Sequence, residues 1–166
     1  MAIVGQLDEF MAGMCGGTVL LYAALPLEAN VWEIIQKRPQ FRYALPRVIS
    51  DSDSLECHAF TNRGVDLLVG AFGIEEPRPE VCPSVELTEL NLIIAPALAL
   101  TPNGKRLGKG GGYYDRLLGD PDLSATIVAV GFDCQVFDDL PMEPHDQSVD
   151  VVITESHRWS PGIVDK

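Results

Sequence analysis

Residues 91–118 read NLIIAPALALTPNGKRLGKGGGYYDRLL and contain the features that decide the fold. The first ten residues are almost entirely apolar, which predicts a central strand covered on both faces. A turn at residues 102–104 follows, and a glycine-rich segment, residues 108–112, then leads into a helix predicted over residues 112–118. A buried strand, a glycine-rich loop and a helix in this order are typical of a phosphate-binding unit.

The rest of the chain alternates apolar strands with short amphipathic segments. Helical spacing of apolar residues predicts a helix over residues 3–14, which the glycines at positions 16 and 17 end. Strands are expected at residues 18–25, 41–48, 55–61, 126–132 and 149–154, a short helix at 31–37, and loops at 50–54 and 73–84. Near-continuous Val, Ile and Leu runs separated by helices predict a mainly parallel α/β sheet with helices on both faces. Ligands of such sheets sit beyond the carboxyl ends of the strands, which directs attention to the segment after Leu100.

Length and charge narrow the classes of function. A chain of 166 residues is close to one domain, so we expect a single α/β domain over residues 1–166. With 24 acidic and 12 basic residues the net charge is -12, which argues against general nucleic-acid or anionic-membrane binding. The longest apolar run is too short to span a bilayer. We therefore expect a cytoplasmic protein, a monomer or weak dimer, without nucleic-acid or membrane partners.

Four cysteines are spaced too widely for paired metal or redox motifs. They are Cys15, Cys57, Cys82 and Cys134, and no two form a CxxC pair. We interpret them as reduced thiols of a cytosolic protein.

Three positively charged residues lie within one stretch of five residues that overlaps the glycine-rich segment, namely Lys105, Arg106 and Lys109. Glycines allow several backbone N–H groups to face one concavity, Arg106 can fork onto phosphate oxygens, and Lys109 can act as a point charge. The P-loop pattern requires Ser or Thr after Gly-Lys, but here Arg106 follows Gly104-Lys105. The dinucleotide pattern GxGxxG requires a glycine at its last position, which is occupied by Tyr113. We infer a phosphate site, favoured for a nucleotide; the alternative is a tight turn with solvated lysines.

Two carboxylates are candidates for magnesium. Asp115 begins the helix after the loop, and Asp146 precedes the last strand. Mg²⁺ usually takes one or two carboxylates together with substrate phosphates. Asp115 alternatively complements the helix dipole. Asp150 and Asp133 are weaker candidates; the neighbouring His145 is either a metal or base residue or, more simply, a hydrogen-bonding loop residue.

Aromatic residues and one further acid suggest a second ligand. Tyr113 and Tyr114 can present flat faces to a planar heteroaromatic ligand. The alternative is that one of them is a core residue and the other a surface residue. Phe72 is a lid or core aromatic. Glu28 follows the carboxyl end of the first strand, so it is a candidate ligand-binding residue. The alternative is that it is an ordinary exposed acid of a loop.

Several blocks, in order, resemble the 5-formyltetrahydrofolate cyclo-ligase (5,10-methenyltetrahydrofolate synthetase) family. They are LLYAALPLEANVWEII, ALPRV, FGIEEPRPE, NLIIAPALAL with NGKRLGKGGGYYDRLL, and VGFDCQVFDDLPMEPHDQSVDVVITE, which together cover roughly residues 18–155. The resemblance implies a three-layer α/β/α sandwich. It also implies a ligase of one-carbon metabolism that uses MgATP to convert 5-formyltetrahydrofolate into 5,10-methenyltetrahydrofolate, releasing ADP and phosphate.

The resemblance also implies roles for individual residues. The ATP site falls on Arg106, Leu107, Gly108, Lys109, Gly110, Gly111, Gly112, Tyr113 and Tyr114. The folate site falls on Glu28, Phe72, Lys109, Gly110, Gly111, Gly112 and Tyr113, with Ala23 at a position near the pterin. Asp115 and Asp146 are the magnesium ligands, and we expect Arg106, Lys109 and Tyr113 to be catalytic.

One departure from the family pattern is at the N-terminus. Family members usually begin with a long basic helix that reaches the ATP phosphates, whereas the first basic residue here is Lys37 and residues 1–17 resemble the family's second helix. The expectation is a chain that starts late or a divergent protein with weakened ATP binding. Two rival functions remain: a non-catalytic folate or nucleotide binder, and another phosphate-using enzyme such as a sugar-phosphate isomerase.

Overall fold

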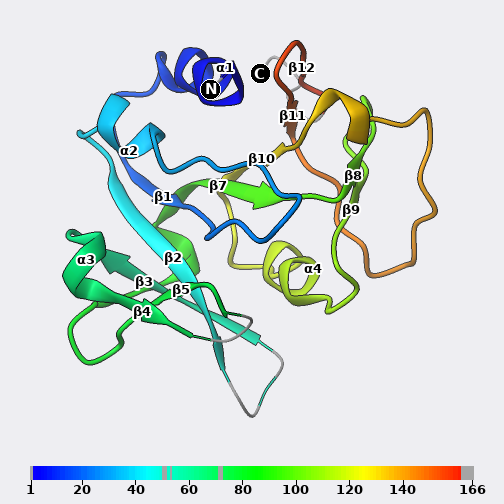
Figure 1. The fold of residues 1–166 in the computed structure, drawn as a ribbon. Helices are drawn as coiled ribbons and strands as arrows, with labels where there is room; N and C mark the ends of the chain where they lie inside the picture. The colour runs from blue at the N-terminus through cyan, green and yellow to red at the C-terminus, as the bar shows by residue number, and fades with distance from the viewer. Residues whose placement is uncertain (1, 50–51, 53, 71–72, 162–166) are drawn as a thin grey trace.

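An eight-stranded sheet crosses the centre of the computed structural model, which describes residues 2–49, 52, 54–70 and 73–161 (Figure 1). The strand order is β12-β11-β10-β7-β1-β2-β3-β6. The strands are β1 (Thr18–Leu20), β2 (Arg42–Ile49), β3 (Ser54–Phe60), β6 (Ser84–Val85), β7 (Leu90–Pro96), β10 (Thr126–Val130), β11 (Val151–Ile153) and β12 (Arg158–Trp159). The five strands from β11 to β2 run parallel to their neighbours, and the outer pairs are antiparallel.

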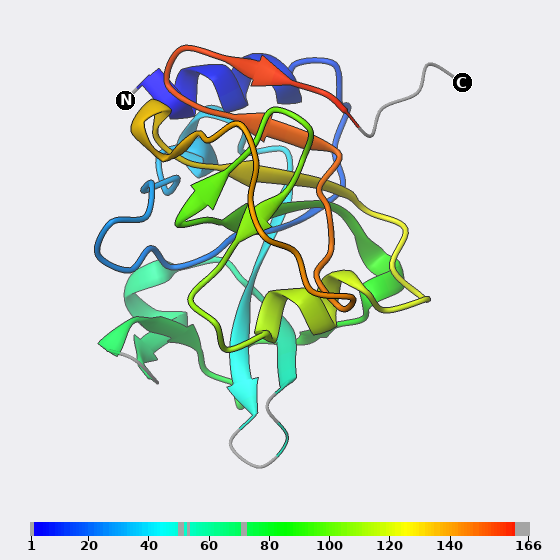
Figure 2. The same cartoon turned by 90° about the vertical axis from the view of Figure 1, so that its right-hand side faces the viewer.

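Helices cover both faces of this sheet. The helices are α1 (Ala2–Met11), α2 (Ile34–Lys37), α3 (Arg63–Asp66) and α4 (Tyr113–Leu118), with 3-10 turns η2 (Leu87–Glu89) and η3 (Asp133–Gln135). Figure 2 shows α1 and α4 on opposite sides of the sheet. The expected α/β class and the layered arrangement of the sandwich are confirmed.

Alternating side chains of β7 build the two cores between these layers. Leu92 and Ile94 pack in one cluster with the buried stripe of α1, whereas Ile93 packs in the other with Leu117 and Leu118 of α4. Successive side chains of a strand point to opposite faces, so a wholly apolar strand needs cover on both sides. The structure thus confirms that the 91–100 segment contributes a central strand.

That segment is not one strand, however. The ladder with β10 ends at Pro96, and after Ala97 and Leu98 the chain forms β8 (Ala99–Leu100), which pairs antiparallel with β9 (Arg106–Leu107). Proline lacks the N–H that would extend the ladder. Leu98 donates its N–H to Leu107 instead, so the chain leaves the sheet as a hairpin.

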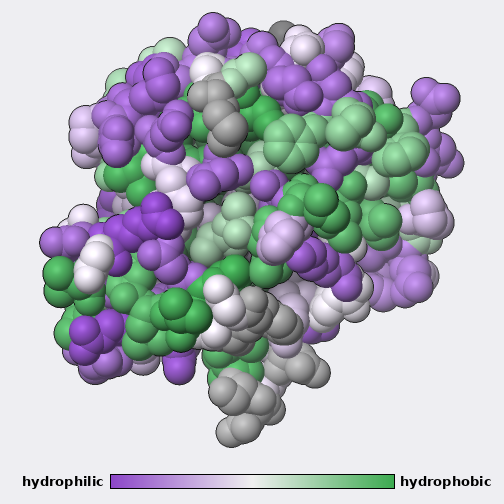
Figure 3. Space-filling view, viewed as in Figure 1, coloured by the Kyte–Doolittle hydropathy of each residue, from purple (hydrophilic) through white to green (hydrophobic). Residues whose placement is uncertain are grey.

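Other expected boundaries also differ. The helix predicted over residues 3–14 ends at Met11, and the short helix predicted over residues 31–37 begins at Ile34. The strand predicted over residues 18–25 ends at Leu20, and the loop predicted over residues 73–84 contains β5 (Glu75–Pro77), paired with β4 (Leu67–Val69). The turn at residues 50–54 lies mostly outside the described residues. Leu68 and Val69 of β4 and Val65 of the preceding helix have exposed side chains. Figure 3 shows apolar surface at the lower left of the molecule.

Among the described residues, no helix combines the length and apolar character that a membrane crossing requires.

The four cysteines are free thiols of two kinds. Cys15 and Cys134 are exposed, whereas Cys57 and Cys82 are buried. Burial, followed by the charge of Glu56, raises the pKa of the Cys57 thiol to about 12. Burial also raises the pKa of Cys82. The thiolate is the reactive form, so only the exposed pair should be nucleophilic near neutrality.

We predict that a short iodoacetamide pulse at pH 8 alkylates Cys15 and Cys134 and spares Cys57. The thiolate fraction of Cys57 is roughly a thousandfold smaller than that of an unperturbed thiol at this pH. Peptide mass spectrometry measures the label at each position, with the unfolded chain as the control in which all four react. Equal labelling of Cys57 and Cys134 in the folded protein would contradict the assignment.

Candidate functional site

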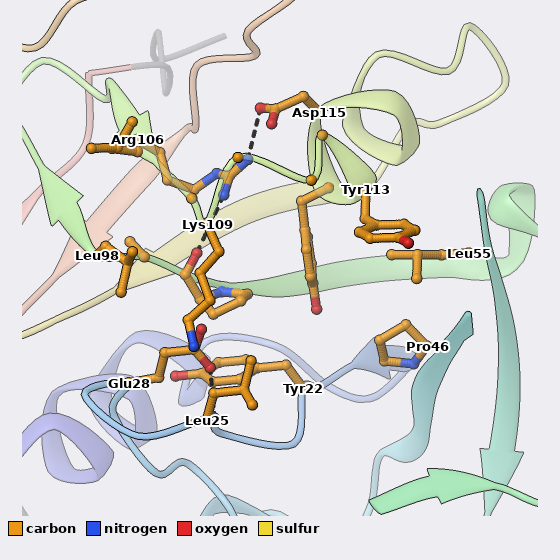
Figure 4. Close-up of a pocket in the computed structure, with 18 of the residues that line it drawn as sticks. Tyr22, Leu25, Glu28, Pro46, Leu55, Leu98, Arg106, Lys109, Tyr113 and Asp115 are labelled. Atoms are coloured by element: carbon orange, nitrogen blue, oxygen red, sulfur yellow. Dashed lines mark hydrogen bonds and ion pairs between the residues drawn. The ribbon is translucent and has the colours of Figure 1, made fainter. Parts of the chain in front are cut away.

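A cavity of about 490 Å³ lies where β1 and β7 end, between the glycine-rich loop and the segment after β1 (Figure 4). Two sets of residues form its walls. One wall is the loop and the start of α4, namely residues 106–115, joined by residues 141–143, 145 and 146. The other wall includes Tyr22, Ala23, Leu25, Glu28, Pro46, Val48 and Leu55. The cavity therefore lies beyond the carboxyl ends of parallel strands, as the sequence predicts.

The glycine-rich loop runs from β9 into α4. Gly110 and Gly112 have φ angles of 84° and 65°, a left-handed conformation that side chains other than glycine rarely adopt. A Cβ on Gly112 would lie 2.7 Å from Nη1 of Arg116. Arg116 folds back over the loop, donates from Nη2 to the carbonyl of Gly111 at 2.9 Å, and lies 5.3 Å from the Tyr113 ring centroid. These contacts fix a turn that a Cβ would disturb.

The three cations of the motif have different environments. Lys105 points away from the cavity lining and pairs with Asp139 at 2.5 Å. Arg106 is buried and pairs with Asp115. Lys109 is exposed at the cavity wall, has no ion-pair partner among the described residues, and extends toward Glu28 in Figure 4. Lys109 is therefore the exposed cation of the motif, whereas the charges of Arg106 and Lys105 are each paired with an aspartate.

Arg106 is held on several sides. Its Nη2 donates to Oδ1 of Asp115 at 2.7 Å, and its Nη1 makes a long contact of 3.4 Å with the carbonyl of Pro96. The guanidinium lies 5.7 Å from the centroid of Tyr114. The side chain is 2% exposed, and its Nε has no hydrogen-bond partner in the described part of the chain. Arg106 thus presents a desolvated positive charge at the cavity wall.

The two predicted magnesium ligands lie on the same wall. Oδ1 of Asp115 accepts from Arg106 and, at 3.5 Å, from the N–H of Gln147, the residue after Asp146. Asp146 accepts the N–H of Glu143 at 2.7 Å and lies 3.7 Å from Nε2 of His145. The described residues contain no group of three metal-ligating side chains. Two carboxylates fit a cation whose other ligands are phosphate oxygens and water.

The weaker acid candidates lie outside this cavity. Asp150 accepts the N–H of Ile127 at 2.8 Å and so joins the start of β10 to the approach of β11. Asp133 lies in η3 beside His157, at 3.5 Å. Neither residue lines the cavity. His145 does line it, with its side chain 64% exposed.

The opposite wall is built by the turn after β1. Glu28 accepts the N–H of Leu25 at 2.7 Å, and the Tyr22 hydroxyl donates to the carbonyl of Ala29. Burial and then the charge of Glu28 raise the pKa of Tyr22 well above its usual value. Tyr22 therefore stays a neutral donor, and it holds the turn that carries Glu28. Phe72 lies outside the described residues.

Both tyrosines of the motif line the cavity, but Tyr114 is also part of the core. It packs against the clusters on both faces of the sheet, and its buried hydroxyl lacks a hydrogen-bond partner among the described residues. Sequence reasoning missed the apolar lining, Pro46, Leu55, Leu98 and Met142, and also Tyr22. For Tyr22 the signal was present, because it follows a strand end on the same side as Glu28.

The chain is similar to known proteins along most of its length. A profile of the 5-formyltetrahydrofolate cyclo-ligase family matches residues 15–155. The 5-formyltetrahydrofolate cyclo-ligase of Mycolicibacterium smegmatis is 40% identical over 88 residues, 53% of this chain and 45% of that protein. The enzyme of that name from Escherichia coli K12 is 35% identical over 95 residues, 57% of this chain and 52% of its own. The alignments thus span about half the length of these relatives.

Solved structures share the fold. The NMR structure of 5,10-methenyltetrahydrofolate synthetase from Aquifex aeolicus has a TM-score of 0.78 and 25% identity, covering 99% of this chain and 84% of that chain. A 5,10-methenyltetrahydrofolate synthetase from Mycoplasma pneumoniae has a TM-score of 0.71 and 22% identity, covering 92% and 82%. At the latter identity the likeness supports the fold alone.

Substituting Gly104, in the turn between β8 and β9, tests how tightly the hairpin that leads into the glycine-rich loop is packed. Its φ is 89°, and a Cβ there would lie 2.6 Å from the carbonyl oxygen of Val149. We predict that Gly104→Ala lowers the free energy of unfolding by about 1–3 kcal/mol, measured by urea denaturation. The matched control is Gly5→Ala within α1, where a Cβ meets nothing within 4 Å. It should raise stability by about 0.5–1 kcal/mol. Equal effects of the two changes would contradict the geometry.

Proposed function

This chain belongs to the 5-formyltetrahydrofolate cyclo-ligase family, and from that premise we propose that it catalyses the ATP-dependent cyclisation of 5-formyltetrahydrofolate. The products are 5,10-methenyltetrahydrofolate, ADP and phosphate. The observation that carries the proposal is the single cavity that has the glycine-rich loop on one wall and Glu28 on the other. One shared cavity suits a reaction in which a phosphoryl group passes directly between two bound molecules.

The nucleotide is assigned to the loop wall. In the proposal, residues 106–114 surround the ATP phosphates, and the exposed ammonium group of Lys109 contacts them. Gly110 and Gly112 keep this wall free of Cβ atoms, so backbone N–H groups can approach an anion closely. Arg106 faces the same space with an Nη1 that has only a long contact to the Pro96 carbonyl.

Magnesium is assigned to Asp115 and Asp146. The fit rests on the donor set, because both carboxylates line the cavity and Gln147 ties the loop that carries Asp146 to Asp115. When bound with ATP, Mg²⁺ would neutralise charge that develops on the phosphate oxygens.

The folate is assigned to the opposite wall. Glu28 accepts hydrogen bonds from pterin N–H groups, with Phe72 and residues 109–113 as further contacts. The apolar lining around Pro46 and Leu55 covers the faces of a planar ring system. This half of the cavity combines an apolar lining with the carboxylates of Glu28, Glu75 and Glu76, and carboxylates beside an apolar surface suit the N–H groups of a pterin.

The reaction needs positioning and charge stabilisation more than covalent help from the protein. The formyl oxygen bonds to the γ-phosphorus while the bond to the bridging oxygen breaks and ADP leaves. Folate N10 then bonds to the formyl carbon, the carbon–oxygen bond breaks, phosphate departs and N10 releases its proton to solvent. Arg106 and Lys109 stabilise the phosphoryl oxygens, and Tyr113 orients the folate against them.

The proposed activity predicts ATP-dependent turnover of 5-formyltetrahydrofolate. In solution with 5-formyltetrahydrofolate and Mg²⁺, we expect the absorbance of the methenyl product to grow only when ATP is present. ATP dependence separates a cyclo-ligase from a sugar-phosphate isomerase. Binding of both substrates without product would replace the enzyme assignment with that of a binding protein.

Another prediction separates the two lysines of the motif. Lys109→Met removes a charge-assisted phosphate contact, so the Kd for a non-hydrolysable ATP analogue should rise roughly 10- to 100-fold. Lys105→Met removes the same charge from a residue that pairs with Asp139 instead, and the Kd should stay within about twofold. Isothermal titration calorimetry measures both. Similar losses in the two variants would mean that net charge, not the position of Lys109, holds the nucleotide.

A further inference from the structure

We propose that Arg106 neutralises Asp115 before nucleotide binds, so that a divalent cation enters this site together with a triphosphate and not alone. This inference rests on the proposed function, because it assumes that Asp115 is a metal ligand. It adds a role for Arg106 besides phosphate contact: a charge that makes metal binding depend on the nucleotide.

Arg106 and Asp115 form a strong ion pair. The Nη2 of Arg106 lies 2.7 Å from Oδ1 of Asp115, and the two side chains are 2% and 15% exposed. Water screens such a pair poorly, so the arginine cancels most of the attraction that Asp115 offers to a second cation. A metal ion near this carboxylate would also feel repulsion from the guanidinium itself.

The two partners cannot easily separate. Arg106 is confined by the Pro96 carbonyl, the Tyr114 ring and the loop backbone, since a Cβ on Gly108 would lie only 3.1 Å from its Nη1. On its other side, Asp115 has a long contact of 3.5 Å from the N–H of Gln147, and its side chain is 15% exposed. Moving either partner would leave a charge desolvated without its counter-ion, which is costly.

Few carboxylate ligands remain for a metal ion that arrives without nucleotide. With Asp115 neutralised, the charge available at this wall is mainly that of Asp146, and one of its oxygens already accepts the N–H of Glu143. Glu143 and His145 are mostly exposed, with side chains 75% and 64% accessible. One effective carboxylate is a weak site for a hard divalent cation.

A bound triphosphate changes this balance. Its oxygens add negative charge and metal ligands at the same wall, and they offer Nη1 of Arg106 a better acceptor than the distant Pro96 carbonyl. Metal and nucleotide then strengthen each other's binding, and the coupling must be equal in both directions. Arg106 is thus the source of the coupling because it penalises the metal only when phosphate is absent.

The test measures Mn²⁺ binding without any nucleotide, from the electron paramagnetic resonance signal of free Mn²⁺. We expect Arg106→Gln to bind Mn²⁺ at least about tenfold more tightly than the wild type. Adding Asp115→Asn to that variant should abolish the gain. The matched control, Lys105→Gln, removes one positive charge from the residue next to Arg106, which pairs with Asp139 instead, and it should change the Kd by about twofold or less.

A second set of titrations includes a non-hydrolysable ATP analogue. The wild type should bind Mn²⁺ much more tightly with the analogue than without it, and Arg106→Gln should lose most of that enhancement. Circular dichroism identifies the variants that remain folded. Arg106→Met, which keeps an apolar stem of similar length, replaces Arg106→Gln if the latter unfolds.

An unchanged or weaker Mn²⁺ affinity in a folded Arg106 variant would overturn the inference, as would a gain that survives Asp115→Asn. Failure of the proposed function has a different signature: the wild type would not bind the analogue even with Mn²⁺ present. The nucleotide-free titrations do not depend on that result.

Discussion

The buried ion pair between Arg106 and Asp115 joins the parts of the molecule that form the cavity. Arg106 belongs to β9 and Asp115 to α4, and the glycine-rich loop spans the distance between them. A buried pair adds little net stability compared with apolar packing, but breaking one partner away is costly. The pair therefore acts chiefly as a geometric constraint, because it fixes the positions at which the glycine-rich loop begins and ends.

This constraint explains how an acidic chain can present a site for anions. The net charge of -12 repels polyanions at long range, whereas a small anion inside the cavity meets mainly the nearby groups. Lys105 is engaged with Asp139 and Arg106 with Asp115, so Lys109 is the cation at the cavity wall that no described acid neutralises. On the proposed function, this local arrangement would favour a small phosphate ligand over nucleic acid.

Much of the fold could be predicted from residue pattern, because a strand buried on both faces has few alternatives to apolar residues. The position of the glycine-rich loop and of Asp115 and Asp146 at one cavity was also predictable, because the loop follows the central strand and ligands of such sheets bind beyond strand ends. The break after Pro96 was not, because an apolar run looks the same in a sheet and in a hairpin that leaves it. Nor could spacing tell Lys105 from Lys109, because the difference depends on Asp139, 34 residues away along the chain.

The two walls of the cavity come from segments far apart in the sequence, and the parallel pairing of β1 and β7 in the central sheet brings them together. The turn carrying Glu28 follows β1, and the hairpin leading to Lys109 follows β7, which pairs with β1 in parallel. A displacement of about 1 Å between reacting groups is enough to slow a positioned reaction about a hundredfold. The apolar contacts of β1 and β7 therefore contribute to any chemistry in this cavity although they touch neither ligand. The burial of residues 91–96 serves the site as much as it serves stability.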